Sequence, residues 1–195
     1  LLGPLLNRFQ AQHPLIQLEV LALDRTVNPV DEGFDIAITL MPQTFGGVVE
    51  QPLCAMPRMV CAAPGYLARK GSPAHPRELG SHDILNFLPT GNTWKFSSAS
   101  GAINVDLQPR FASNEAQLLL QAALAENGIA ILSAYLARPA IESGHLVPLL
   151  EDYPMADGWV TALIPESRAR VARVNALVQW LRVHLADPMA SQSSA

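Results

Sequence analysis

The chain has 195 residues, of which 49% are hydrophobic and 15% charged, so it can bury a large core and intrinsic disorder is excluded for most of it. Its formal net charge of −4 makes it a poor candidate for binding DNA by itself, because neutralising phosphates requires clustered lysine and arginine. No apolar run approaches the roughly 20 residues of a membrane helix. Two cysteines, Cys54 and Cys61, are too few for a disulfide scaffold and indicate a reducing compartment.

The first 40 residues alternate between helical and strand patterns. Apolar residues at helical spacing predict a helix over residues 3–12, which Pro14 stops. Alternating apolar and polar residues predict a strand over 15–21. A short helix over 28–32 and a buried strand over 35–40 follow. This order favours a parallel α/β sheet.

The middle of the chain is predicted to be rich in strands. A short helix over 64–70 and a helical turn at 76–79 interrupt them. The segment SASGA, residues 98–102, predicts a hairpin between the strands that flank it. The predicted strands are 48–53, 58–63, 84–88, 94–98 and 103–111.

The clearest helix begins at Asn114, which with Gln117 resembles a capping box, and it ends at Gly128. A helix over 133–143 contains Pro139, which should split or kink it. The remaining predicted elements are strands over 129–132, 146–150 and 159–164 and a long final helix over 168–185. Residues 188–195 are small and polar and are predicted to form a loose tail.

The sequence shows no pattern for catalysis or metal binding. Ser133 lies between a strand and a helix but lacks the glycines of a nucleophile elbow. The five histidines have no ligand spacing, and Cys54 and Cys61 are too far apart for a C-x-x-C pair. We therefore predict no catalytic residue, no metal site and no cofactor. Ligand binding remains, and two places favour it: the loop over 39–44 after a strand, and Ser113 with Asn114 at a helix start.

Six segments, taken in order, resemble the effector-binding domain of LysR-type transcriptional regulators. The match covers about residues 3–186. The segments are LLGPLLNRFQAQHPLIQLEV, DEGFDIAI, MVCAAPGYLARKGSPAHPRELGSHDIL, NTWKF, ASNEAQLLLQAALAENGIAILSAYL and ESGHLVPLLEDY.

The resemblance implies an α/β fold like that of type 2 periplasmic binding proteins, in which two Rossmann-like lobes are joined by two crossover strands around an effector cleft. The lobes would comprise residues 1–61 with 165–187, and 62–164. The crossovers would fall near residues 59–63 and 162–165.

The resemblance also implies which residues line the effector site. They follow a strand of the first lobe and three elements of the second. Ser113 and Asn114 are the preferred candidates. The family often has arginine where this chain has Thr39, so an anionic effector held at that position is less expected. The full set is Thr39, Leu40, Met41, Phe87 to Thr90, Ser113, Asn114 and Ser133.

The implied partners are a small-molecule effector and further copies of the chain, as a homodimer or homotetramer, in the cytoplasm. Residues 3–12 of one copy would pack against 114–126 of another. DNA would be bound only through a helix-turn-helix domain that this sequence lacks. The family's domain usually opens with a strand and a loop before its first helix. Since residue 1 is Leu, we expect the native chain to include them.

Three alternatives remain open. The domain could serve assembly in a constitutive regulator without an effector. It could be a free-standing solute-binding protein of the same fold, although no signal-peptide pattern is present. It could also be a small-molecule hydrolase or isomerase, which a histidine within hydrogen-bond reach of Ser113 or Ser133 would support.

Overall fold

The computed structural model describes residues 2–23, 25, 27–41 and 43–190 of the chain. They divide into two compact units, one of residues 1–55 and 159–195 and one of residues 56–158. Both crossings of the chain lie earlier than the predicted 59–63 and 162–165. The physical reason is that, among the described residues, the strand predicted over 58–63 pairs only with strands of the second unit.

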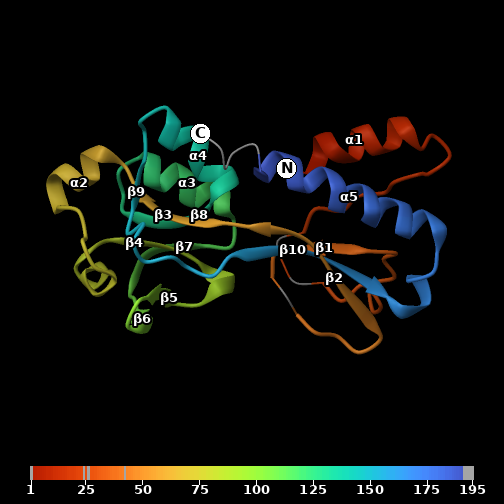
Figure 1. Ribbon diagram of the computed structural model, residues 1–195, viewed down its shortest axis with the longest axis horizontal. Coiled ribbons are helices and arrows are strands. Elements are labelled where there is room, and N and C mark those ends of the chain that lie inside the picture. Colours follow the sequence, from red (N-terminus) through yellow and green to blue (C-terminus); the bar gives the residue numbers. More distant parts are fainter. Residues whose placement is uncertain (1, 24, 26, 42, 191–195) are drawn as a thin grey trace. The chain divides into compact units, whose positions relative to one another are not determined.

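The first unit packs two helices and a small sheet. Helix α1 (Leu2–Gln12) matches its prediction and lies beside α5 (Ala172–Ala190) (Figure 1). The ring of Phe9 meets that of Trp180 edge-on at 5.8 Å, and Trp180 donates its indole N–H to the carbonyl of Leu5 at 3.2 Å. Asp35 accepts ion pairs from two arginines of the C-terminal region, at 3.0 and 3.4 Å.

The sheet of the first unit corrects two expectations. Strand β1 (Ala37–Thr39) runs antiparallel to β10 (Gly158–Pro165), not parallel, and β2 (Val48–Met56) completes the order β1-β10-β2. Residues 15–21 form no strand, and residues 29–33 form turns instead of the helix predicted over 28–32. Leu15 is 97% and Val20 61% exposed. An alternating pattern forms a strand only when a partner supplies hydrogen bonds, and none of the described strands pairs with this segment.

A five-stranded mixed sheet forms the centre of the second unit, in the order β7-β4-β8-β3-β9. The two neighbours of β4 are both parallel to it, whereas β3 is antiparallel to both of its own neighbours. The strands are β3 (Arg58–Ala62), β4 (Ile84–Phe87), β7 (Pro109–Ser113), β8 (Ile129–Ser133) and β9 (Val147–Leu149).

Both faces of this sheet are covered (Figure 1). One face, here called the helix face, packs against α3 (Ala116–Leu124) and α4 (Ala134–Glu142). The other, the hairpin face, packs against β5 (Thr93–Ser98) and β6 (Gly101–Asp106) and also against α2 (Pro64–Lys70) and η1 (Pro76–Ser81). Side chains alternate as strands require: Val60 belongs to the hairpin-face cluster and Cys61 to the helix-face cluster.

Three predicted boundaries in this unit and at the C-terminus need correction. The strand predicted over 103–111 is two strands, because β6 pairs with the hairpin partner β5 and β7 pairs with β4. Helix α4 runs through Pro139 without a break. The tail predicted over 188–195 is helical as far as Ala190, since a proline in the last turn removes only one backbone donor. Residues 191–195 lie outside the described residues.

A buried amide network anchors the loop after β4. Asn86 is 1% exposed and accepts a hydrogen bond from the indole N–H of Trp94 at 3.0 Å. Its side-chain amide donates to the carbonyl of Gly91 at 2.9 Å and to Oδ1 of Asn92 at 3.0 Å. This one side chain therefore holds the loop that contains η2 (Leu88–Thr90) against the hairpin.

Replacing Asn86 by Leu should destabilise the second unit by about 2–3 kcal/mol, because the change keeps the volume but leaves the buried Trp94 N–H and loop groups without partners. Urea unfolding followed by circular dichroism measures the loss. Asn104→Ala on exposed β6 is the control and should change the free energy of unfolding by less than about 0.5 kcal/mol. Equal stability of the two variants would contradict the anchoring role.

Candidate functional site

The carboxyl ends of three parallel strands meet at one edge of the sheet of the second unit. Phe87 and Ser113, the last residues of β4 and β7, are direct partners in the register, and Ser133 ends the neighbouring β8. The sequence-predicted positions of this unit therefore lie along a single edge. Ligands of open α/β sheets bind at such edges.

Strand alternation divides this edge between the two faces of the sheet. Phe87 packs with the helix-face cluster, so its register partner Ser113 lies on that face as well. Ser133 has the same parity as Ile129 and Ile131, which pack with the hairpin-face cluster. The two serines thus belong to opposite faces.

Ser113 and Asn114 do not cap the helix in the way predicted. The hydroxyl of buried Ser113 accepts a hydrogen bond from the backbone N–H of Glu115 at 2.9 Å. That turn moves the helix start onward, so the N-cap of α3 is Glu115, whose carboxylate accepts from the N–H of Gln117 at 2.9 Å. The predicted pairing of Asn114 with Gln117 is therefore wrong by one residue, and Asn114 is exposed.

The two threonines of the predicted site bind their own loops. Thr90 donates its hydroxyl to the carbonyl of Phe87 at 2.8 Å. In the first unit, the hydroxyl of Thr39 donates to the carbonyl of Met41 at 3.1 Å and accepts from its N–H at 3.0 Å. Leu40 between them is exposed. These hydroxyls shape turns at strand ends, which is the usual local use of threonine.

Ser133 differs from these residues. It is half-buried and stands at the N-cap of α4, yet its side chain makes no capping hydrogen bond. The backbone N–H of Ala134, the first residue of that helix, donates to the carbonyl of Pro57 at 2.8 Å. Among the residues that the structure describes, the hydroxyl of Ser133 has no hydrogen-bond partner.

The structure adds Arg58, which sequence reasoning missed. Arg58 opens β3 and is the direct register partner of Ser133, so both side chains lie on the hairpin face. Its Nε and Nη2 both donate to the carbonyl of Ala156, the former at 3.0 Å. Burial lowers the pKa of the guanidinium, and the charge of Asp157 opposes this shift. The pairing joins residues 75 positions apart, and no local pattern indicates it.

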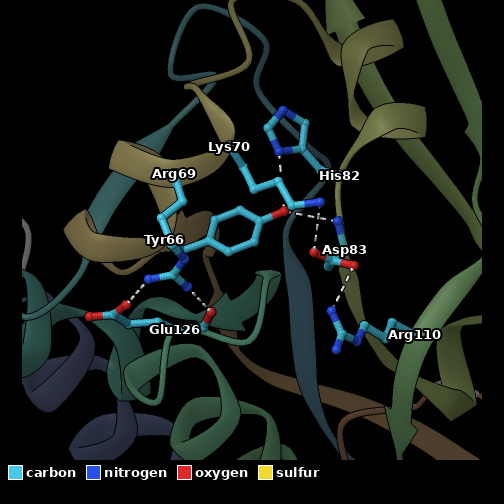
Figure 2. Close-up of polar contacts among 7 residues, drawn as sticks. All are labelled: Tyr66, Arg69, Lys70, His82, Asp83, Arg110 and Glu126. Carbon is cyan, nitrogen blue, oxygen red and sulfur yellow. Dashed lines mark hydrogen bonds and ion pairs between the residues drawn. The ribbon is translucent and has the colours of Figure 1, made fainter.

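The opposite, amino edge of the same sheet carries a cluster of charges that bind one another (Figure 2). Asp83, just before β4, pairs with Arg110 at 3.1 Å and with Lys70 at 3.6 Å. Burial disfavours its ionisation, but the hydrogen bond from Arg110 and the charge of Lys70 outweigh burial and lower the pKa of Asp83. Arg69 pairs with Glu126. These groups saturate one another and hold α2 and the start of β4 together.

Tyr66 and His82 complete this cluster. The hydroxyl of Tyr66 accepts a hydrogen bond from the backbone N–H of Asp83 at 2.8 Å and lies 3.2 Å from Nδ1 of His82. Desolvation and the charge of Lys70 lower the pKa of His82, against the opposing charges of Asp83 and Glu78. The neutral imidazole can therefore accept a hydrogen bond from the Tyr66 hydroxyl.

The serine, histidine and cysteine side chains of the described residues have the following contacts. Within the described ranges, a serine–histidine hydrogen bond is formed by Ser143 and His145, at 2.8 Å on an exposed turn, and not by Ser113 or Ser133. Burial raises the pKa of Cys61 to about 12, so its thiol is a poor nucleophile. In the same ranges, no cluster of histidine, cysteine or carboxylate groups could hold a metal ion, and no helix is long and apolar enough to cross a membrane.

The family is established by comparison with known proteins. The family model for the LysR substrate binding domain matches residues 1–186, so the chain belongs to this family. The chain is 31% identical over 185 residues to the uncharacterized HTH-type transcriptional regulator YhjC of Escherichia coli (strain K12), covering 93% of this chain and 62% of that protein. It is 32% identical over 154 residues to the HTH-type transcriptional regulator CrgA of Neisseria meningitidis serogroup C (strain 8013), covering 78% of this chain and 51% of CrgA.

Solved structures agree with this assignment. The CrgA regulatory domain from Neisseria meningitidis superposes with a TM-score of 0.81 at 29% identity, over 95% of this chain and 92% of that one. The effector domain of AmpR from Pseudomonas aeruginosa, at 22% identity, shares the fold with a TM-score of 0.73 over 99% of this chain and 92% of that one. These matches confirm the predicted fold class, an α/β fold like that of type 2 periplasmic binding proteins. The chain spans between half and two thirds of the length of the curated relatives named above.

Acidification should destabilise the chain through His82. The pKa of His82 in the folded state lies below the ordinary value of 6.5, so the unfolded state binds more protons. The contribution of His82 to the free energy of unfolding is therefore complete above pH 6.5 and is lost as the pH falls through the pKa of the folded state. Between about pH 7.5 and about pH 5.5, the melting temperature of the wild type should fall more than that of His82→Asn. Exposed His145→Asn is the control and should behave like the wild type. An identical fall in His82→Asn would refute the assignment.

Proposed function

We propose that this domain binds a small-molecule effector at the carboxyl edge of the second unit's sheet and thereby regulates the longer protein of which it is a part. The observation that carries the proposal is that half-buried Ser133 is the strand-register partner of Arg58, and that both side chains have hydrogen-bonding capacity which the described residues leave unused. Binding can shift a conformational equilibrium only if the effector has different affinities for the two states.

Transcription regulation is proposed for the longer protein. YhjC and CrgA are named HTH-type transcriptional regulators, and this chain covers 62% and 51% of them. The chain's net charge of −4 is unsuited to binding DNA phosphates, so DNA would be contacted by a helix-turn-helix part outside residues 1–195. An effector signal would pass to that part, and the protein would act in the cytoplasm, where DNA is found.

Ser133→Ala should weaken effector binding. A thermal-shift screen of small carboxylates, amides, sugars and aromatics against the purified chain identifies a ligand, and calorimetry measures its affinity. Loss of one hydrogen bond should reduce affinity about three- to tenfold. Ser72→Ala, at an exposed position, is the matched control and should bind like the wild type. Unchanged affinity in Ser133→Ala would place the effector elsewhere, with Ser113 and Asn114 as the next positions to replace.

Assembly of two copies is the second part of the proposed role. Leu118 of α3 is 52% exposed, on the helix that the resemblance pairs with α1 of another copy. An isologous contact between α1 and α3 would cover this side chain in both copies. Exposed apolar residues also follow α1, among them Val20 and Leu21.

Leu118→Asp should convert dimers of the chain into monomers, because the contact would then bury two carboxylates without partners. Sedimentation velocity measures the change as a function of concentration. The control is Asn104→Asp, which introduces the same charge on the exposed hairpin strand β6 and should leave the dimer intact. A dimer of unchanged affinity in Leu118→Asp would exclude α3 from the interface.

A further inference from the structure

Arg58 makes no ion pair with any carboxylate among the described residues, and the charge of Asp157 acts on it only from a greater distance. Arginines such as Arg69, Arg110 and Arg168 lie within ion-pair distance of a carboxylate, whereas no described carboxylate lies that close to Arg58. Arg58 is also half-buried, and desolvation lowers its pKa, so its charge is held under an energetic cost that the charge of Asp157 offsets only in part. An anion bound beside it would offset that cost.

The guanidinium has donors left over and is held in place. Of its five N–H groups, two are used on the carbonyl of Ala156, and the described residues supply no partner for the other three. The double contact with one carbonyl restrains the guanidinium plane. A guanidinium group whose orientation is already fixed loses little conformational entropy when it binds a planar oxyanion through two parallel hydrogen bonds.

The surroundings of Arg58 favour the same chemistry. Ser133 lies directly across the strand pair on the same face, where opposite side chains have Cβ atoms about 4.5–5.5 Å apart. Its hydroxyl is an additional donor that the protein leaves unused. The segment that carries Ala156 belongs to the hairpin face too, because the carbonyl of Pro154 accepts from the N–H of Ser97 on β5 at 2.8 Å.

We propose that Arg58 and Ser133 form an oxyanion subsite that binds a carboxylate of the effector, with Arg58 as the residue that selects acids over neutral ligands. The inference rests on the proposed function and adds to it the chemical class of the ligand.

The test compares acids with their own amides on the purified chain. Calorimetry with succinate against succinamide and phenylacetate against phenylacetamide keeps shape nearly constant while the charge is removed, and inorganic phosphate is the third arm. At least one carboxylate should bind at least tenfold more tightly than its amide. Arg58→Gln should remove that preference by lowering carboxylate affinity at least tenfold. Arg58→Lys keeps the positive charge but loses the planar pair of donors, so its carboxylate affinity should lie between those of the wild type and Arg58→Gln.

Two controls separate recognition from folding. Arg77→Gln removes an exposed arginine of the same unit and should keep carboxylate affinity within about twofold of the wild type. Melting temperatures of all variants, with Arg58→Lys as the conservative replacement, show whether loss of the Ala156 contact has unfolded the unit. Affinity should follow the residue at position 58 and not the melting temperature.

Each contrary outcome has a distinct meaning. Amides that bind as tightly as acids, with affinity still reduced in Ser133→Ala, would overturn the anion subsite and leave the effector site standing. Carboxylates that bind Arg58→Gln as well as the wild type would remove Arg58 from the site. Tighter binding of phosphate than of any carboxylate would replace the proposed ligand class. Failure of every acid and every amide to bind would count against both the subsite and the proposed function.

Discussion

The second unit depends on one constraint: the inner strands of its sheet are apolar on both sides, so both faces must be covered. Ile84 and Leu85 are adjacent on β4 and both are 1% exposed, one packing on the hairpin face and the other on the helix face. Because side chains alternate along a strand, covering both faces fixes the orientation of every residue in it. The same constraint reaches the strand ends, where it turns Arg58 and Ser133 to the hairpin face.

The two edges of this sheet contrast in how they use their polar groups. At the amino edge, Asp83 binds Arg110 and Lys70, and its N–H binds Tyr66, so charges and donors are matched within the fold. At the carboxyl edge, a guanidinium and a hydroxyl retain unused donors among the described residues. Matched charges stabilise the fold, whereas unused donors at the end of parallel strands provide the capacity to bind a ligand.

Several polar side chains at the carboxyl edge bind the backbone of the loops there and hold those loops in place before any ligand binds. Ser113 and Thr90 each close a turn at the end of a strand, and Asn86 holds the intervening loop against Trp94. These contacts fix the loops in one conformation. A ligand that binds beside them therefore meets groups whose ordering has already occurred during folding, which favours affinity.

The sequence by itself determined the α/β class, most element positions and, through its resemblance, the family. Those features are local, because a helical stripe such as that of α1 or a buried run such as β8 is recorded in neighbouring residues. The candidate strand ends Phe87, Ser113 and Ser133 could be named for the same reason. Residues 15–21 show the limit of local information, since their alternation is that of a strand but no described strand pairs with them.

Only the tertiary structure decided how those strand ends relate. It placed Ser113 and Ser133 on opposite faces, assigned the N-cap to Glu115, engaged Thr39 in its own turn and paired Arg58 with Ser133. The faces of Ser113 and Ser133 and the pairing of Arg58 depend on strand register between segments far apart in the chain, whereas the N-cap and the Thr39 turn are made by contacts two residues apart. Strand register is set by which apolar faces pack together. The free energy gained by burying those faces is available only once the whole sheet is assembled.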